Sequence, residues 1–312
     1  MAWQSSVVNS AADLVASIVD FAVAQGWALS GSVLSKGGAY IELTAPSVSE
    51  VRIRAARGGV FSGIDLCPRY PRIFITSWPS SAEVQLFAFD DPDTVWCVLR
   101  TNSTDYMHLG FGSIAKYGDW AGGQWFHAQH TGSNTDRQVC ATVGGGAQPY
   151  FNTSARNCAL FWSQRDRDLW SGGSTVNKCS FLHCEVRGEV WPATGPSNDA
   201  SDLNVIHCPT ITTPIHSNNP NVFNGQTVLS PFLLFLQNTD GHYMSVGHLG
   251  HLRFVKLTNY NPGDIVSIAG DRWRVFPWDR KDPTNPDGKA PSSGDSSAST
   301  GLLGIAISYD GP

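Results

Sequence analysis

Cysteine and histidine residues in the middle of the chain have the types and spacing of metal ligands. Cys179, His183 and Cys184 lie close together in the sequence, and His207 precedes Cys208. Structural zinc needs four nitrogen or sulfur ligands, which usually come as two closely spaced pairs. His183 and Cys184 are adjacent, so on a strand their side chains point to opposite faces. Only one of them can therefore bind the same metal ion. A weak zinc candidate remains, made of Cys179, His183 and Cys208, and buried cysteine in a β core is the preferred alternative.

Paired carboxylates are the next groups that could do chemistry, because a glycosidase sets two of them at a defined separation. Asp166 and Asp168 lie near Trp162 and Trp170, whose rings could stack on a sugar, but they alternate with Arg165 and Arg167. Pairing with these arginines would lower the pKa of each acid, which does not suit a general acid. The sequence also has no Gly-x-Ser-x-Gly motif and no Walker-type loop. We therefore expect no catalytic residue and no cofactor, and a metal-dependent or glycan-cleaving enzyme is the weakest alternative.

Tryptophans in the same middle region could bind a sugar or a protein partner. Flat aromatic faces beside Asn and Asp side chains can hold sugars, and exposed loops often carry such contacts. The alternative is that these residues pack the loops onto the sheets, which is the usual role of tryptophan. Both interpretations stay open for five residues: Trp120, Trp125, Trp162, Trp170 and Trp191.

Composition favours protein contacts over nucleic acid or membrane. Charged residues make up 15% of the chain, against roughly 25% in an average soluble domain. The 11 tryptophans and the low charge suit large permanent interfaces, although a tryptophan-rich core would give the same composition. The net charge is -5 and no basic run occurs, so neither a nucleic-acid surface nor an anionic-membrane patch is expected.

No address signal or membrane insertion is expected either. The apolar stretch Leu14–Ala24 contains Asp20 and follows no basic region. It is too short to span a bilayer and lacks the features of a signal peptide. The 7 cysteines are an odd number without an export signal, which indicates reduced thiols in a cytoplasm.

The elements that must position these residues begin with one helix. Ser10 is a good N-cap, Leu14, Ile18 and Phe21 recur at helical spacing, and Gly26 follows as a C-cap. This predicts an amphipathic helix of about four turns, packed on a sheet. Strands are then expected at Ala39–Thr44, Glu50–Ala55, Val84–Phe89, Thr94–Arg100 and Asp105–Phe111.

Three regions follow from these signals, either as separate domains or as one continuous domain. Residues 1–115 form a helix on an antiparallel sheet of about five strands. Residues 116–224 form an irregular, loop-rich aromatic region. Residues 225–312 form β hairpins, interrupted at 279–300 by a polar insertion that is expected to be flexible. The predicted fold class is α+β, mainly antiparallel β.

The expected elements of the last region are two hairpins and a final strand. The hairpins pair Leu229–Gln237 with His242–Val246 and Ile265–Ala269 with Arg272–Pro277, the second across a turn at Gly270 and Asp271. After the insertion, the chain returns for a last strand within Gly301–Asp310. The polar stretch is therefore an insertion between strands rather than a tail.

Several stretches of the chain resemble virion structural proteins of tailed bacteriophages. They are the opening Met1–Ser5 with a helix that ends at Ala24–Trp27, then Leu109–Trp125, Asn261–Asp264, Gly270–Pro277 and Gly304–Ile307. The resemblance implies a tail or baseplate component that assembles in the host cytoplasm, as a homo-oligomer in contact with other virion proteins. It implies no catalytic positions. The insertion at 279–300, or the middle loops, would reach a neighbouring subunit. The runner-up is a tail protein that binds a receptor or a host surface glycan.

Overall fold

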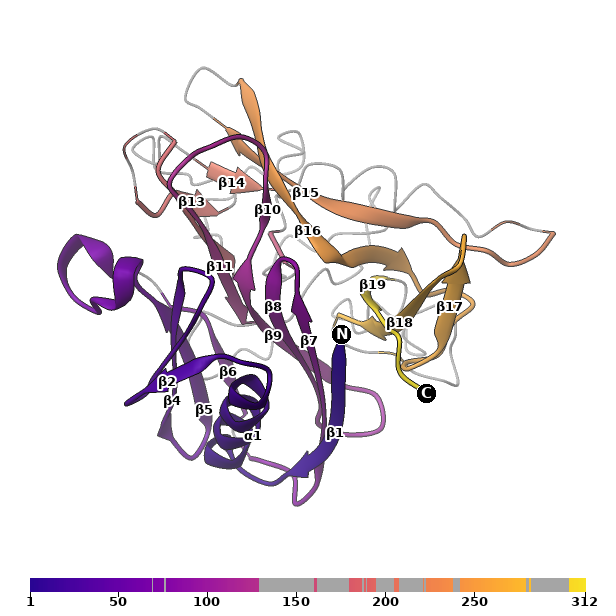
Figure 1. The fold of residues 1–312 in the computed structure, drawn as a ribbon. Coiled ribbons are helices and arrows are strands. Elements are labelled where there is room, and N and C mark those ends of the chain that lie inside the picture. The colour runs from indigo at the N-terminus through magenta and orange to yellow at the C-terminus, as the bar shows by residue number, and fades with distance from the viewer. Residues whose placement is uncertain are drawn as a thin grey trace, which may run out of the picture.

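The computed structural model describes residues 1–68, 70–75, 77–128, 160–161, 180–186, 188, 190–194, 205–207, 221, 223–237, 242–278, 281 and 303–312. One helix and three sheets make up this part of the chain (Figure 1). The strands pair antiparallel apart from the short β13–β14 pair. The expected fold class, mainly antiparallel β with one N-terminal helix, is confirmed.

The N-terminal sheet and the helix come first. The helix α1 spans Ala11–Ala24. The backbone N–H of Asp13 donates to the Ser10 hydroxyl over 3.1 Å, which confirms the expected N-cap. The five-stranded N-terminal sheet follows the chain order: β2 (Ala28–Ser30), β3 (Val33–Lys36), β4 (Ala39–Ser47), β5 (Glu50–Ala55) and β6 (Arg72–Phe74).

The central sheet has six strands, and they come from positions between Ala2 and Cys184 of the chain. In spatial order they are β1 (Ala2–Val8), β7 (Ala82–Asp90), β8 (Asp93–Arg100), β9 (Tyr106–Ser113), β11 (Gly122–Ala128) and β12 (Ser180–Cys184). Its β7–β8 hairpin turns through a cis Asp91–Pro92 peptide bond.

The C-terminal sheet has eight strands. Seven lie in the order β13 (Ala193–Thr194), β14 (Val205–His207), β15 (Leu229–Gln237), β16 (Tyr243–Lys256), β19 (Leu303–Ser308), β18 (Asp271–Pro277) and β17 (Ile265–Ile268). The eighth, β10 (Ala115–Lys116), pairs with β16. The last strand, β19, thus inserts between β16 and β18, and a return of the chain to the sheet is confirmed.

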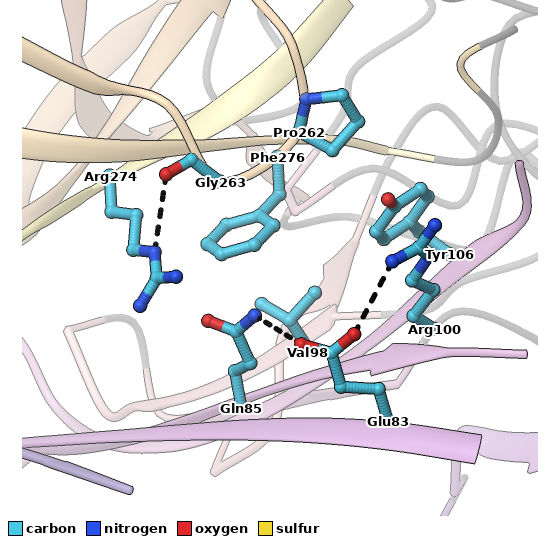
Figure 2. A pocket seen from close by; sticks show the side chains of 9 residues that line it. All are labelled: Glu83, Gln85, Val98, Arg100, Tyr106, Pro262, Gly263, Arg274 and Phe276. Atoms are coloured by element: carbon cyan, nitrogen blue, oxygen red, sulfur yellow. Dashed lines mark hydrogen bonds and ion pairs between the residues drawn. The ribbon is translucent and has the colours of Figure 1, made fainter. Parts of the chain in front are cut away.

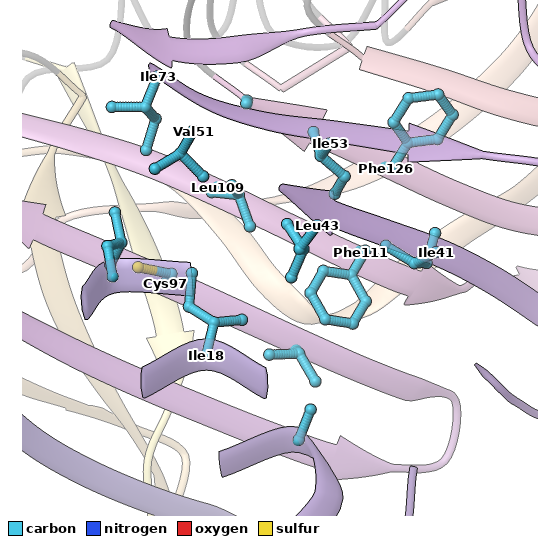
Figure 3. Close-up of a cluster of buried hydrophobic side chains, with 14 of the residues drawn as sticks. Ile18, Ile41, Leu43, Val51, Ile53, Ile73, Cys97, Leu109, Phe111 and Phe126 are labelled. Atoms are coloured by element: carbon cyan, nitrogen blue, oxygen red, sulfur yellow. The ribbon is translucent and has the colours of Figure 1, made fainter. Parts of the chain in front are cut away.

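Both faces of the central sheet are buried, so the molecule has three layers. Ile18 of α1, Ile41 of β4 and Phe111 of β9 share one core between the helix, the N-terminal sheet and the central sheet (Figure 3). On the opposite face, Trp96 and Phe254 share a second core between the central and C-terminal sheets. Burial on both faces explains the nearly continuous apolar runs of β7 and β8.

The layering corrects the expectation of a single sheet in residues 1–115. Strands from this range form the whole N-terminal sheet and also β1, β7, β8 and β9 of the central sheet. The loop-rich range 116–224 adds β11 and β12 to the same central sheet. The expected boundary at residue 115 therefore falls next to strands that hydrogen-bond across it, since β9 pairs with β11.

Two further details of the last region differ from expectation. The strand expected at His242–Val246 begins at Tyr243 and continues as β16, which runs for 14 residues. The β17–β18 turn is centred on Ala269 and Gly270, whose φ angles are 52° and 93°. Within the insertion expected at 279–300, the structure describes Lys281 alone. Its ammonium donates to the Leu257 carbonyl over 2.6 Å and is buried, so this point of the insertion is packed against the fold.

Candidate functional site

The five tryptophans singled out from the sequence have different environments in the structure. Trp125 is fully buried in the core between the central and C-terminal sheets, and its ring nitrogen donates to the Ser113 carbonyl over 3.3 Å. Its ring is therefore not available to a ligand. Trp120 is half-buried, and the Lys116 ammonium lies 5.2 Å from its ring centroid. Trp162 and Trp170 lie outside the described residues.

Trp191 lies beside another residue singled out from the sequence, His183. The two rings are 5.3 Å apart at their centroids and tilted by 37°. The Trp191 ring nitrogen also donates to the Asp65 carbonyl over 3.1 Å. These contacts bring a loop after β12 against a segment that is more than a hundred residues earlier in the sequence, and they define the candidate site.

A chain of charged side chains joins the same two segments. One guanidinium, that of Arg57, contacts the Asp65 carboxylate at 2.7 Å and the Glu185 carboxylate at 2.8 Å. The same Glu185 oxygen lies 2.7 Å from Nε2 of His183. The order is thus Asp65, Arg57, Glu185 and His183, with partly exposed carboxylates and a His183 side chain that is only 9% exposed.

The segment that carries Arg57 and Asp65 is closed at its base. Residues 57–65, which we call the anchored segment, lie between Ala56 and Leu66, which form an antiparallel β-bridge. The Ala56 carbonyl also accepts from the Gln124 side-chain amide of β11 over 3.1 Å. The oxygen of that amide accepts from the Tyr40 backbone over 2.8 Å. Buried Gln124 thereby ties the base of the segment to the central sheet.

The anchored segment presents apolar side chains to solvent. It forms the purple coil that projects at the left edge of Figure 1 and contains two short 3₁₀ turns, Arg57–Gly59 and Gly63–Asp65. Ile64 is 78% exposed and Val60 is 52% exposed. Apolar side chains on a fixed, projecting backbone are suited to protein contact.

The electrostatics of the cluster do not favour acid–base catalysis. The guanidinium of Arg57, and then the ring of His183, lower the pKa of Glu185, so this acid stays ionised. Burial lowers the pKa of His183, although the Glu185 carboxylate opposes this. Cys184 is adjacent, but burial raises the pKa of its thiol to about 11. A thiol of this kind is a poor nucleophile at neutral pH.

The structure describes only one of the three residues of the zinc candidate. His183 lies in the cluster just described, while Cys179 and Cys208 lie outside the described residues. Among the residues that the structure describes, no group of three or more His, Cys, Asp or Glu side chains could hold a metal ion. The side chain of Cys184 is buried with a free thiol, as expected for a cysteine in a β core.

The sequence analysis singled out His183 and Trp191 but not Arg57, Asp65 and Glu185. No local pattern could have found them, because Arg57 and Glu185 are 128 positions apart. The sequence signal that does exist is the Gly58–Gly59 pair, whose φ angles of 63° and 79° let the chain turn tightly after Arg57.

Comparisons with known proteins do not supply a family for this chain. No protein-family model matches the sequence, and no curated protein matches it. Within the described residues, no helix has the length and apolar character needed to cross a membrane.

Proposed function

We propose that this chain is a non-enzymatic structural protein of a tailed-phage virion, a tail or baseplate component that acts through subunit assembly. The observation that carries the proposal is the anchored segment, where Val60 and Ile64 are exposed on a backbone held by Arg57. Other virion proteins, and further copies of this chain, are the proposed partners.

A fixed presentation matters because association is opposed by the ordering of mobile groups at an interface. Single exposed apolar residues are ordinary on protein surfaces. Here the β-bridge at Ala56 and Leu66 and the two contacts of Arg57 hold the backbone in place before any partner binds. The two side chains are therefore preorganised for a contact.

Two features of the sequence support the same proposal. The chain has few charged residues, 15% of the total, and 11 tryptophans, a composition that suits permanent interfaces. The stretches Leu109–Trp125 and Gly270–Pro277 resemble virion structural proteins of tailed phages. In the structure they contain parts of β9 and β11 of the central sheet and all of β18 of the C-terminal sheet, so the resemblance lies in parts that build the fold.

Native mass spectrometry of the full chain tests the assembly proposal. The wild-type chain is expected to form a defined homo-oligomer, and a variant with Val60→Asp and Ile64→Asp is expected to be monomeric. Val48→Asp is the matched control, because Val48 is 83% exposed but lies in the turn between β4 and β5. A monomeric wild type, or an oligomeric double variant, would contradict assembly through this segment. Virion membership is tested separately by mass spectrometry of purified particles from a phage that encodes the chain, which must contain several copies of it.

A further inference from the structure

A small pocket lies between the central and C-terminal sheets, away from the anchored segment. Its volume is about 140 Å³. Figure 2 shows the residues that form it: β7, β8 and β9 supply one wall, and β18 with the loop between β16 and β17 supplies the other. The lining residues that matter here are Glu83, Gln85, Tyr106, Gly263, Arg274 and Phe276.

The first polar group of interest is the Gln85 side-chain amide. Gln85 is only 9% exposed, and its Nε2 donates to the Glu83 carboxylate over 2.9 Å. A carboxylate only accepts hydrogen bonds, so this contact fixes which end of the amide faces Glu83. The Gln85 Oε1 is thus an acceptor on the pocket wall, buried and without a hydrogen-bond partner among the described residues.

The second group is the Arg274 guanidinium on the opposite wall. Its Nε donates to the Gly263 carbonyl over a long 3.3 Å. The rings of Trp3 and Tyr309 lie 5.0 Å and 5.2 Å from its central carbon. Its Nη1 is buried and has no hydrogen-bond partner in the described part of the chain. An unused donor and an unused acceptor thus line one pocket, where each costs stability if left unpaired.

The charges around the pocket restrict what can satisfy both atoms. A carboxylate ligand would face the Gln85 oxygen and the Glu83 carboxylate, which repel it. An ammonium ligand would face Arg274 and Arg100, since Arg100 lines the pocket and pairs with Glu83 at 3.4 Å. A neutral hydroxyl can accept from Arg274 and donate to Gln85 at once.

We propose that this pocket binds one sugar ring through its hydroxyl groups. A cavity of roughly 150 Å³ holds a six-membered benzene ring, so a pocket of about 140 Å³ matches the size of one six-membered sugar ring. Phe276 offers an apolar wall for a ring face (Figure 2). Solvent does not reach the two unpaired atoms, so the ligand must displace the Arg274 side chain slightly from its long bond to Gly263.

This inference is independent of the proposed assembly function and of the tryptophans singled out from the sequence. It places carbohydrate recognition at the interface of two sheets instead of on the middle loops. A primary amide, such as an Asn side chain, also carries one donor and one acceptor. The experiment therefore includes an amide probe beside the sugars.

The test is an NMR titration of the full, isotope-labelled chain. The probes are the methyl glycosides of glucose, galactose and mannose, with acetamide, acetate and methylammonium as comparisons. At least one glycoside is expected to give saturable shifts of the Gln85 amide and the Arg274 Nε–H signals at concentrations on the order of millimolar. Absence of shifts with all three glycosides, shifts only outside the pocket, or stronger binding of acetamide than of any glycoside would overturn the proposal.

Two variants test whether the glycoside binds through Gln85 Oε1 and Arg274 Nη1. Gln85→Met keeps the length of the side chain and removes the acceptor, and Arg274→Lys keeps the charge and removes Nη1. Each is expected to weaken glycoside binding roughly tenfold, the effect of about 1.4 kcal/mol. Arg272→Lys on the same strand is the matched control, because Arg272 binds the Gly311 carbonyl and does not line the pocket. Unchanged affinity in both test variants would overturn the assignment. If either variant fails to fold, the wild-type shift map decides.

Discussion

Arg57 and Glu185 are 128 positions apart in the sequence, and Nη1 of Arg57 donates to Oε1 of Glu185 over 2.8 Å. The same guanidinium holds Asp65 at the other end of the anchored segment. One side chain therefore closes the segment on itself and fastens it beside β12 of the central sheet. Because Glu185 also contacts His183, the exposed apolar residues are fixed relative to the central sheet.

Glu185→Gln is expected to loosen the anchored segment without unfolding the protein. The amide keeps an oxygen for Arg57 but loses the charge, and partly exposed ion pairs contribute little to global stability. Hydrogen exchange of residues 57–65 should become several-fold faster, because local opening depends on local contacts. Glu42→Gln is the control, since Glu42 pairs with Arg54 at 3.0 Å within the N-terminal sheet. Equal exchange in wild type and Glu185→Gln would contradict the role of the pair.

Local sequence signals predicted the helix and many strands. Ser10 and the spacing of Leu14, Ile18 and Phe21 define α1, because caps and helical periodicity are local. The bounds of β5 and β15 were predicted to the residue. The layering was not predicted, because an apolar run such as that of β7 does not reveal which elements cover its two faces.

The length of β16 was missed for a reason that the packing explains. Gly247 and Gly250 lie within this strand, and glycine in a strand interior often marks a close approach of another backbone. In the structure, a side chain at Gly247 would collide with the Ala115 carbonyl of β10, so glycine allows two backbones to approach closely. The contact between Arg57 and Glu185 was missed for a different reason. Both are common surface residue types, and only the tertiary fold brings them together.

His108 is expected to make the protein less stable in mild acid. Its ring is fully buried, Nε2 lies 2.7 Å from the Pro277 carbonyl, and burial lowers its pKa to about 4. The unfolded chain, with a histidine pKa of about 6.5, therefore binds a proton that the folded chain does not. The free energy of unfolding therefore keeps its full value above this unfolded-state pKa. It falls by up to about 3 kcal/mol as the pH drops toward 4.

The measurement for His108 is the free energy of unfolding at several pH values between 7 and 4. His108→Gln keeps a donor for the Pro277 carbonyl and removes the titrating ring, so its curve is expected to be flatter than that of wild type. A His108→Gln curve as steep as that of wild type would show that other groups cause the acid sensitivity.

Ser10→Ala is expected to lower the free energy of unfolding by about 1 kcal/mol, the usual cost of a lost N-cap. The change removes the hydroxyl that accepts from the Asp13 N–H at the start of α1. Ser10→Asp keeps an acceptor at this position and should remain close to wild type. Urea unfolding of the three chains checks the prediction, which fails if the Ala and Asp variants are equally stable.

Gly110→Ala is expected to disturb the core between the central and C-terminal sheets. In the strand register, Gly110 of β9 lies between Trp96 of β8 and His127 of β11. The rings of these two neighbours are nearly parallel, with centroids 5.7 Å apart and a tilt of 6°. A methyl group on Gly110 would overlap the Trp96 ring, and Trp96 is fully buried, so the ring cannot move away freely.

Overpacking of this kind costs about 1–3 kcal/mol and sometimes more, which denaturant unfolding of Gly110→Ala would detect as a lower midpoint. Gly250→Ala in β16 is the matched control, because a methyl group there would meet Pro92 at an ordinary contact distance of 3.4 Å. Near-UV circular dichroism of Gly110→Ala should also change, since the tryptophan environment depends on the ring packing. If both glycine variants have the same midpoint as wild type, the core around Trp96 has more free space than its contacts indicate.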